Sequence, residues 1–232
     1  MIIGSGLIAH AFRAAYAHND KVCIYAAGVS NSACRDAHEF IRERQRLTSA
    51  LQQMQQAECF VYFSTCSVAD PEVRQSPYVQ HKLAMEQLVT AHPRHLILRL
   101  PQVAGKTPNP HTLLNFLYAH IARSESFELW SKASRNIIDV DDVAAIANLL
   151  IADTSARNIT VNIANPVSDT MPDIVAAMEY TVGKAAVYEA LARGSEYTID
   201  ISAIRPLLDK AGVRFGDDYL RTVMGKYYAK AD

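Results

Sequence analysis

Short apolar runs alternate with longer amphipathic stretches along this chain, and that alternation is what most constrains its fold. The runs at residues 22–26, 59–63, 95–100 and 159–163 have the length and composition of buried strands. The stretches between them space their apolar residues as one face of a helix does. Because strands that alternate with helices form βα units, the pattern predicts a parallel sheet covered by helices.

The expected helices fill the intervals between these strands. Pro77 suits the first turn of one helix, and Pro93 ends it. A very short strand at residues 1–3 precedes the first helix. The chain after residue 163 is expected to be rich in helix, with one or two short strands. The other helices are expected at residues 7–18, 36–57, 112–121 and 143–151.

Composition places the chain among folded proteins that stay in solution. Half of its 232 residues are hydrophobic, which excludes wholesale disorder. The 23 Lys and Arg nearly balance the 24 Asp and Glu, so charge favours neither nucleic acid nor a membrane surface as a partner. No apolar run approaches the roughly 18 residues of a membrane-spanning helix, and the first residues lack the pattern of a signal peptide. Four cysteines without a CxxC pair fit a reducing compartment, so we expect a cytoplasmic protein.

The sequence predicts no metal site. A proline separates the two histidines at residues 92–95, so they cannot share a helical face, and no cysteine or acidic cluster joins them. The acidic residues at 139–142 lack the glycine-containing loop of a calcium site. The G-x-S-x-G motif of acyl transfer and the G-x-x-x-x-G-K-[ST] motif of nucleotide hydrolysis are also missing.

A glycine-rich turn follows the first expected strand. Residues 4–9 read G-S-G-L-I-A, which has the spacing G-x-G-x-x-A between a strand and a helix. In a dinucleotide fold Gly4 would allow the tight turn, Gly6 would let a pyrophosphate approach the backbone, and Ala9 would allow close packing. An ordinary glycine turn explains the same residues about equally well.

A tyrosine and a lysine lie four residues apart on the helix that begins at Pro77. Tyr78 and Lys82 share a helical face, and a neighbouring ammonium group lowers the pKa of a phenol. Such a tyrosine transfers a proton to or from an alcohol or ketone as hydride moves. Ser64 and Thr65 end the preceding strand, where the Thr65 hydroxyl would reach the same substrate oxygen. Taken alone, Tyr78 and Lys82 are more simply a surface pair, and Ser64 and Thr65 are more simply an ordinary hydroxyl-rich strand end. The glycine turn, the hydroxyl-rich strand end and the Tyr–Lys pair, in this order along the chain, together favour a catalytic site.

These motifs together resemble the extended short-chain dehydrogenases/reductases, specifically the NAD-dependent epimerase/dehydratase family that acts on nucleotide sugars. The likeness extends along almost the whole chain. Each motif alone is weak evidence for the resemblance, but six motifs in the order of the family are strong evidence. They are residues 4–9, 25–28 (YAAG), 63–68 (FSTCSV), 76–82 (SPYVQHK), 99–105 (RLPQVAG) and 135–144 (RNIIDVDDVA).

The resemblance implies an enzyme that uses NAD or NADP and has a Thr–Tyr–Lys site. Tyr78 would be the acid/base, Lys82 would lower its pKa and bond the nicotinamide ribose, and Thr65 would orient the substrate oxygen. Arg135 would hold the diphosphate of the substrate, because a guanidinium matches phosphate oxygens bidentately; a surface arginine before a strand explains it nearly as well. Gln102 is the other implied substrate contact. The implied cofactor contacts are Gly4, Gly6, Leu7, Ile8, Ala26, Ala27, Gly28, Ser64, Lys82, Pro101 and Val103.

The chain departs from the family pattern in two ways. Between the glycine motif and residues 25–28 the family has two further strands and a helix, where this chain has about a dozen helical residues. The acidic residue expected about 20 residues past the glycines is missing, so the sequence does not distinguish NAD from NADP. Arg35 could meet a 2′-phosphate, although an exposed helix arginine is the simpler account.

The second departure concerns the reaction type. Family dehydratases place an Asp–Glu pair directly after the catalytic Thr, where Cys66 and Ser67 stand here, so ketoreduction or epimerisation is favoured over dehydration.

We therefore expect an α/β protein: a Rossmann-type parallel sheet with a reduced number of strands, plus a small C-terminal substrate-binding lobe. The dinucleotide-binding part would comprise residues 1–105 and 135–164, and the lobe residues 106–134 and 165–232. The expected function is NAD(P)-dependent reduction or epimerisation of a nucleotide-linked sugar or keto-sugar. The alternative is a non-catalytic Rossmann-like binding or regulatory protein that has lost the full dinucleotide site. The resemblance also implies a homodimer formed through the two long helices of the N-terminal half.

Overall fold

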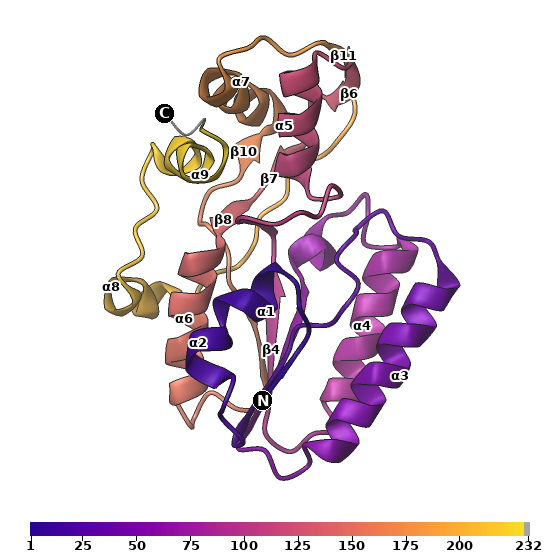
Figure 1. Cartoon of the computed structure of the whole chain (residues 1–232), viewed down its shortest axis with the longest axis vertical. Helices are drawn as coiled ribbons and strands as arrows, with labels where there is room; N and C mark the ends of the chain where they lie inside the picture. Colours follow the sequence, from indigo (N-terminus) through magenta and orange to yellow (C-terminus); the bar gives the residue numbers. More distant parts are fainter. Residues whose placement is uncertain (230–232) are drawn as a thin grey trace.

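A five-stranded parallel sheet forms the centre of the computed structural model, which describes residues 1–229. The order of the strands is β1-β2-β3-β4-β9, and each neighbouring pair is parallel (Figure 1). The predicted α/β class and the parallel sheet with few strands are confirmed. The strands are β1 (Ile2–Ile3), β2 (Val22–Tyr25), β3 (Cys59–Thr65), β4 (His95–Leu100) and β9 (Ile159–Asn162).

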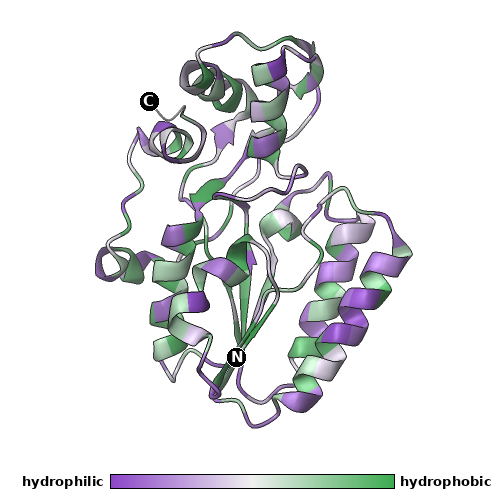
Figure 2. Cartoon of the chain, in the orientation of Figure 1, coloured by the Kyte–Doolittle hydropathy of each residue, from purple (hydrophilic) through white to green (hydrophobic). Residues whose placement is uncertain are grey.

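Helices cover both faces of this sheet. One face carries α1 (Leu7–Ala11), α2 (Arg13–Tyr16) and α6 (Val140–Ala152); the other carries α3 (Ala37–Gln53) and α4 (Pro77–Val89) (Figure 1). Figure 2 shows hydrophobic strands enclosed between them, with hydrophilic residues along the outward side of α3. Among residues 1–229, no helix combines the length and hydropathy needed to cross a membrane.

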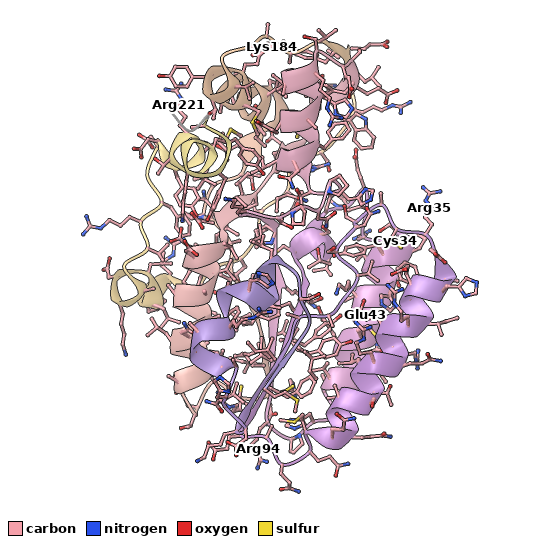
Figure 3. All side chains as sticks on the ribbon, viewed as in Figure 1. Cys34, Arg35, Glu43, Arg94, Lys184 and Arg221 are labelled. Atoms are coloured by element: carbon pink, nitrogen blue, oxygen red, sulfur yellow. The ribbon has the colours of Figure 1, made fainter. Side chains whose placement is uncertain are left out.

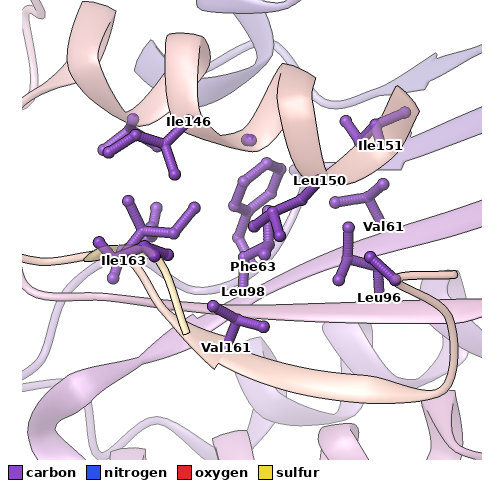
Figure 4. Packing of buried hydrophobic residues seen from close by; sticks show 14 of the residues in the cluster. Val61, Phe63, Leu96, Leu98, Ile146, Leu150, Ile151, Val161 and Ile163 are labelled. Atoms are coloured by element: carbon purple, nitrogen blue, oxygen red, sulfur yellow. The ribbon is translucent and has the colours of Figure 1, made fainter. Parts of the chain in front are cut away.

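Two hydrophobic cores lie on opposite faces of the sheet. On one face, Val61 and Leu98 pack against Ile146 and Leu150 of α6 (Figure 4). On the other face, Tyr62 belongs to a core that α3 and α4 cover. Because successive residues of a strand point to opposite faces, the fully buried β3 contributes to both cores.

Most of the remaining elements lie beyond the carboxyl ends of the strands (Figure 1). Three helices enclose a further core there: α5 (Leu113–Arg123), α7 (Met171–Val182) and α9 (Tyr219–Tyr228). Three strand pairs accompany them: β5 (Gln102–Ala104) with β8 (Ile137–Asp139), β6 (Phe127–Trp130) with β11 (Tyr188–Leu191), and β7 (Ser134–Arg135) with β10 (Asp169–Thr170). Helix α8 (Leu208–Ala211) instead packs against α6 and the first core, although it falls within the range 165–232 predicted for the lobe.

The first helical segment differs from the expected single helix over residues 7–18. Helices α1 and α2 meet at Phe12, whose ring is buried against Phe63 and Tyr16. The backbone of Phe12, at φ −96° and ψ −4°, lies in the bridge region of backbone conformations. The helix is therefore interrupted at the residue whose side chain anchors it to the sheet.

Strand β1 is the edge of the sheet. It has two residues and pairs with β2 alone. The family that the sequence resembles has further strands between its glycine motif and the strand that matches β2. The sheet thus lacks these strands, as the shortened sequence predicts.

Leu98 offers a test of the core, because its side chain is fully buried. Leu98→Ala should lower the free energy of unfolding by about 3 kcal/mol, since the lost side chain leaves a cavity under α6. Urea unfolding followed by circular dichroism measures this change. Val187→Ala is the control: that side chain is 48% exposed, so the change should be below about 0.5 kcal/mol. Equally small changes in both variants would contradict the packing described.

Candidate active site

The carboxyl ends of the parallel strands open into one cleft with a volume of about 400 Å³. The segments that end or follow β1, β2, β3 and β4 all contribute to its walls, as expected when parallel strands end at a common edge. Motifs that are far apart in the chain therefore meet at one place. The predicted site residues that line the cleft are Gly4, Gly6, Leu7, Ile8, Ala26, Ala27, Gly28, Ser64, Thr65, Tyr78, Lys82, Pro101, Gln102 and Val103.

The glycine turn after β1 leaves room for a bound molecule. Gly4 has a φ of +133°, which favours glycine, and a Cβ there would collide with the carbonyl of Ala26. At Gly6 a Cβ would meet no protein atom within 4 Å, so this position opens into the cleft. The Ser64 hydroxyl, which also lines the cleft, is buried without a hydrogen-bond partner among the described residues. The cleft thus offers both space and unused hydrogen-bonding capacity.

Tyr78 and Thr65 lie together at the end of β3. Both residues are buried, and the Thr65 hydroxyl caps the following 3-10 helix by accepting a hydrogen bond from the Ser67 backbone N–H at 3.1 Å. Burial raises the pKa of Tyr78, the hydrogen bond with Thr65 lowers it, and the negative charge of Glu43 raises it further. The net change is upward. Tyr78 therefore carries its proton at neutral pH.

The ammonium group of Lys82 is held in a buried network. Within residues 1–229, its Nζ has three partners: Glu43 Oε1 at 3.2 Å, Tyr62 Oη at 3.1 Å and the Phe63 carbonyl oxygen at 3.3 Å. Tyr78, the neighbour expected from the sequence, is not one of them. Lys82 thus finds its charge partner on α3 rather than on its own helix.

Glu43 is the centre of this network, with a side chain only 1% exposed. Its carboxylate accepts hydrogen bonds from Tyr62 Oη at 2.9 Å and from the Val29 backbone N–H at 2.7 Å, and it lies 2.9 Å from His81 Nε2. Burial alone would raise its pKa, but the hydrogen bond from His81 and the charge of Lys82, together with the other two donors, lower it to about 2. Glu43 is therefore an ionised carboxylate inside the protein.

Glu43 is not among the predicted site residues, although the sequence carries a signal for it. Phe40 and Leu47 belong to the apolar seam of α3, and Glu43 lies three residues after the first and four before the second. That spacing places it on the buried face of the helix. In Figure 3, Glu43 lies on the inner side of α3, whereas Arg35 extends away from the body of the molecule.

Arg135 is not among the described residues that line the cleft. It lies in β7, where its Nη1 donates a hydrogen bond to the Ser134 carbonyl at 2.7 Å and stands 4.0 Å from Asp70 Oδ2. Asp70 also accepts a hydrogen bond from the Ser195 hydroxyl at 3.3 Å. The guanidinium group is thus engaged by protein groups. Its predicted contact with a substrate diphosphate stays a prediction and requires it to turn away from Asp70.

Many solved structures are similar to this chain, and three of them illustrate the likeness. The UDP-glucuronic acid 4-epimerase from Bacillus cereus, in complex with UDP-glucuronic acid and NAD, has 21% identity and a TM-score of 0.70, over 90% of this chain and 74% of that chain. RMD from Pseudomonas aeruginosa, complexed with NADPH, has 18% identity and a TM-score of 0.67, over 88% and 80%. The dTDP-glucose 4,6-dehydratase from Bacillus anthracis, in complex with NAD, has 14% identity and a TM-score of 0.69, over 90% and 71%. At these identities the likeness shows a shared fold.

No curated protein matches the chain. A family model does match, that of the NAD dependent epimerase/dehydratase family, over residues 9–164. The matched range begins after the two glycines of the turn and includes Thr65, Tyr78 and Lys82. It spans well over half of the chain. The chain therefore belongs to the NAD-dependent epimerase/dehydratase family.

Proposed function

We propose that this chain is an NAD(P)-dependent oxidoreductase or epimerase that acts on a nucleotide-linked sugar or keto-sugar, with ketoreduction favoured over dehydration. The observation that carries the proposal is the meeting of Thr65, Tyr78 and Lys82 with the glycine turn in one cleft. Hydride transfer to a carbonyl needs three things from a protein: a proton donor, a cation, and a backbone that the dinucleotide can approach closely. Membership of the NAD-dependent epimerase/dehydratase family supports the NAD-dependent part of the proposal.

The residues of the cleft fit a nicotinamide dinucleotide. Open space at Gly6 would admit the pyrophosphate, and the unpartnered Ser64 hydroxyl is free to bond a cofactor atom. Residues 26–28 would lie along the cofactor, and Lys82 would bond the nicotinamide ribose. Similar structures were solved with NAD and with NADPH, so both are candidates.

In the proposed reaction, Tyr78 moves the proton. A bound nicotinamide supplies the hydride for reduction of a carbonyl carbon, or accepts it in the reverse direction. Tyr78 donates its phenolic proton to the carbonyl oxygen, so that an alcohol forms and a tyrosinate is left to be reprotonated. Thr65 holds the same oxygen by a hydrogen bond, and the positive charge of Lys82 stabilises the tyrosinate. In epimerisation the same tyrosine would first remove the proton and then return it.

Cys66 argues against dehydration. Its thiol is buried and donates a hydrogen bond to the Arg99 carbonyl at 3.3 Å, and burial raises its pKa to about 12. A thiol in this environment stays protonated at neutral pH and does not act as a general base. Cys66 and Ser67 occupy the positions at which family dehydratases have an Asp–Glu pair. The chain thus lacks that acid and base at these two positions.

A polar loop in the wall of the cleft suits a sugar nucleotide. Thr107, Asn109 and His111 line the cleft together with Gln102. Asn115 orders this loop, because its side-chain amide donates hydrogen bonds to the carbonyls of Thr107 at 2.9 Å and Asn109 at 2.8 Å. The similar Bacillus cereus epimerase was solved with UDP-glucuronic acid. Together these observations support a nucleotide-linked sugar as the substrate class.

One observation favours the non-catalytic alternative. The sheet ends at the two-residue strand β1, so the adenosine half of a dinucleotide would meet few protein groups. A Rossmann-like protein without dinucleotide binding would retain the cleft but would not turn over a substrate. Measurement of dinucleotide binding separates the two functions.

Titration of the purified protein with NADH and NADPH, followed by nucleotide fluorescence, should show saturable binding of at least one. Gly6→Ala should weaken this binding about tenfold or more, because its Cβ fills the space that the ligand needs. The same variant should lower the free energy of unfolding by less than about 1 kcal/mol, the scale of an altered N-cap. Gly225→Ala is the matched control, since a Cβ there also meets no atom within 4 Å but lies in α9. Failure of the wild type, freed of carried-over nucleotide, to bind either dinucleotide would refute the proposed enzyme.

Tyr78→Phe should reduce turnover about 10²- to 10⁴-fold, because it removes the proton donor and little else. The assay follows NADH or NADPH absorbance with a panel of UDP- and dTDP-linked keto-sugars. Tyr180→Phe is the control: that tyrosine is 81% exposed, so activity should stay unchanged. Thermal melting monitors the fold of both variants. Full activity of Tyr78→Phe would exclude the proposed role of the phenol.

A further inference from the structure

We infer that Glu43 is a positioning residue that holds the ammonium group of Lys82 at the wall of the cleft and joins it to the loop after β2. The inference rests on the proposed function, in which Lys82 is the cation beside the nicotinamide ribose. Glu43 comes from α3, outside the Thr–Tyr–Lys set. It is not among the described residues that line the cleft, so it acts through Lys82.

The carboxylate of Glu43 connects three elements of the fold. Its Oε1 accepts hydrogen bonds from Lys82 Nζ and Tyr62 Oη. Its Oε2 accepts from the Val29 backbone N–H and faces His81 Nε2. A carboxylate accepts about four hydrogen bonds, so these four partners use its capacity. Contacts from the loop after β2, from β3 and from α4 therefore fix its position.

Gly28 fits closely over the Glu43–Lys82 pair. A Cβ at Gly28 would lie 2.5 Å from Lys82 Nζ and 2.7 Å from Glu43 Oε1. Gly28 itself lines the cleft, in the segment that the proposed function assigns to the cofactor. Glu43 thus lies directly behind the part of the cleft wall that Gly28 and Lys82 form. Any side chain at Gly28 would displace the pair.

Other ionisable groups also surround the Lys82 ammonium. Glu86 is the second carboxylate nearby, but it forms a two-pronged ion pair with Arg99, at 2.8 and 2.6 Å. Its charge is therefore already matched, which leaves Glu43 as the counter-ion of Lys82. The titratable groups that face this region are Glu43 on α3, Tyr62 on β3, and Tyr78, His81 and Glu86 on α4.

The charge of Glu43 gives the pair its function. Removing a lysine from water is costly while it is charged, and a hydrogen-bonded carboxylate offsets that cost. Burial lowers the pKa of Lys82, whereas the charge and the hydrogen bond of Glu43 raise it. Without this carboxylate Lys82 would lose its proton more readily. A neutral amine would not stabilise the tyrosinate at Tyr78.

Glu43→Gln removes the charge and keeps the shape and an acceptor oxygen. In protein labelled with ¹³C and ¹⁵N at lysine and measured without cofactor, the pKa of Lys82 should fall by about one unit or more, a tenfold loss of proton affinity. The signal of Lys82 is assigned as the lysine signal that is missing from the spectrum of Lys82→Arg. The affinity for NADH or NADPH, whichever the wild type binds, should fall about tenfold, and the high-pH limit of activity should move to lower pH.

Two further variants separate charge from packing. Glu39→Gln lies one turn earlier on α3, where the carboxylate pairs with Arg42 at the surface, and it should leave the Lys82 pKa and the dinucleotide affinity unchanged. Tyr62→Phe removes two hydrogen bonds of the network but keeps the ion pair, so its effect on the pKa should be smaller than that of Glu43→Gln. No shift in Glu43→Gln, or an equal shift in Tyr62→Phe, would overturn the inference.

The wild type alone provides a decisive measurement if Glu43→Gln fails to fold. A neutral Lys82 amine at pH 7 in the wild type would overturn the inference without any variant. A charged Lys82 whose pKa depends on Glu43, in a protein that binds neither NADH nor NADPH, would instead overturn the proposed function. Glu43 would then stabilise the fold without positioning a cofactor contact.

Discussion

The buried ion pair between Glu43 and Lys82 is the interaction on which the site depends. Taking two charges out of water costs several kcal/mol for each ion, and only good geometry with further hydrogen bonds offsets that cost. Here the further bonds come from Tyr62, Val29 and His81. These residues lie on β3, on the loop after β2 and on α4, so the pair persists only if those elements keep their mutual positions. The parallel pairing of β2 with β3 fixes two of these elements relative to each other.

The strand order explains how a shortened sheet can retain a complete set of reacting groups. Thr65 ends β3, the middle strand of five, and the helix that follows it carries Tyr78 and Lys82. The strands that this chain lacks would lie beyond β1, at the edge farthest from β4 and β9. Their loss shortens the wall for the adenosine half of a dinucleotide and leaves the centre of the sheet unchanged. The missing strands should therefore affect the affinity for the cofactor more than they affect the chemical step.

Local patterns in the sequence predicted the elements but not the polar contacts between them. Strand β4 occupies the predicted residues 95–100, and α4 begins at the predicted Pro77, because burial and helix-start signals are local. The helix breaks at Phe12, whose ring packs against Phe63, 51 residues later in the chain. Glu43 was not predicted because a glutamate in a polar helix is usually exposed to solvent. Only its spacing from the apolar residues of α3 indicates that it is buried. The contact of Arg135 with Asp70 joins distant segments, which no local pattern encodes.

The protonation states of the site bear on the direction of the proposed reaction. Burial and the charge of Glu43 raise the pKa of Tyr78, and Lys82 directs its ammonium group to Glu43 rather than to the phenol. Tyr78 thus holds the proton that ketoreduction requires at its start, while the raised pKa makes the phenol a weaker acid than a free tyrosine. Epimerisation begins with the opposite task, because Tyr78 must first accept a proton from an alcohol, and for this its pKa must fall. The protonated form of Tyr78 is therefore the one from which the proposed ketoreduction starts, and the charge that Glu43 maintains on Lys82 would stabilise the tyrosinate that the reaction leaves.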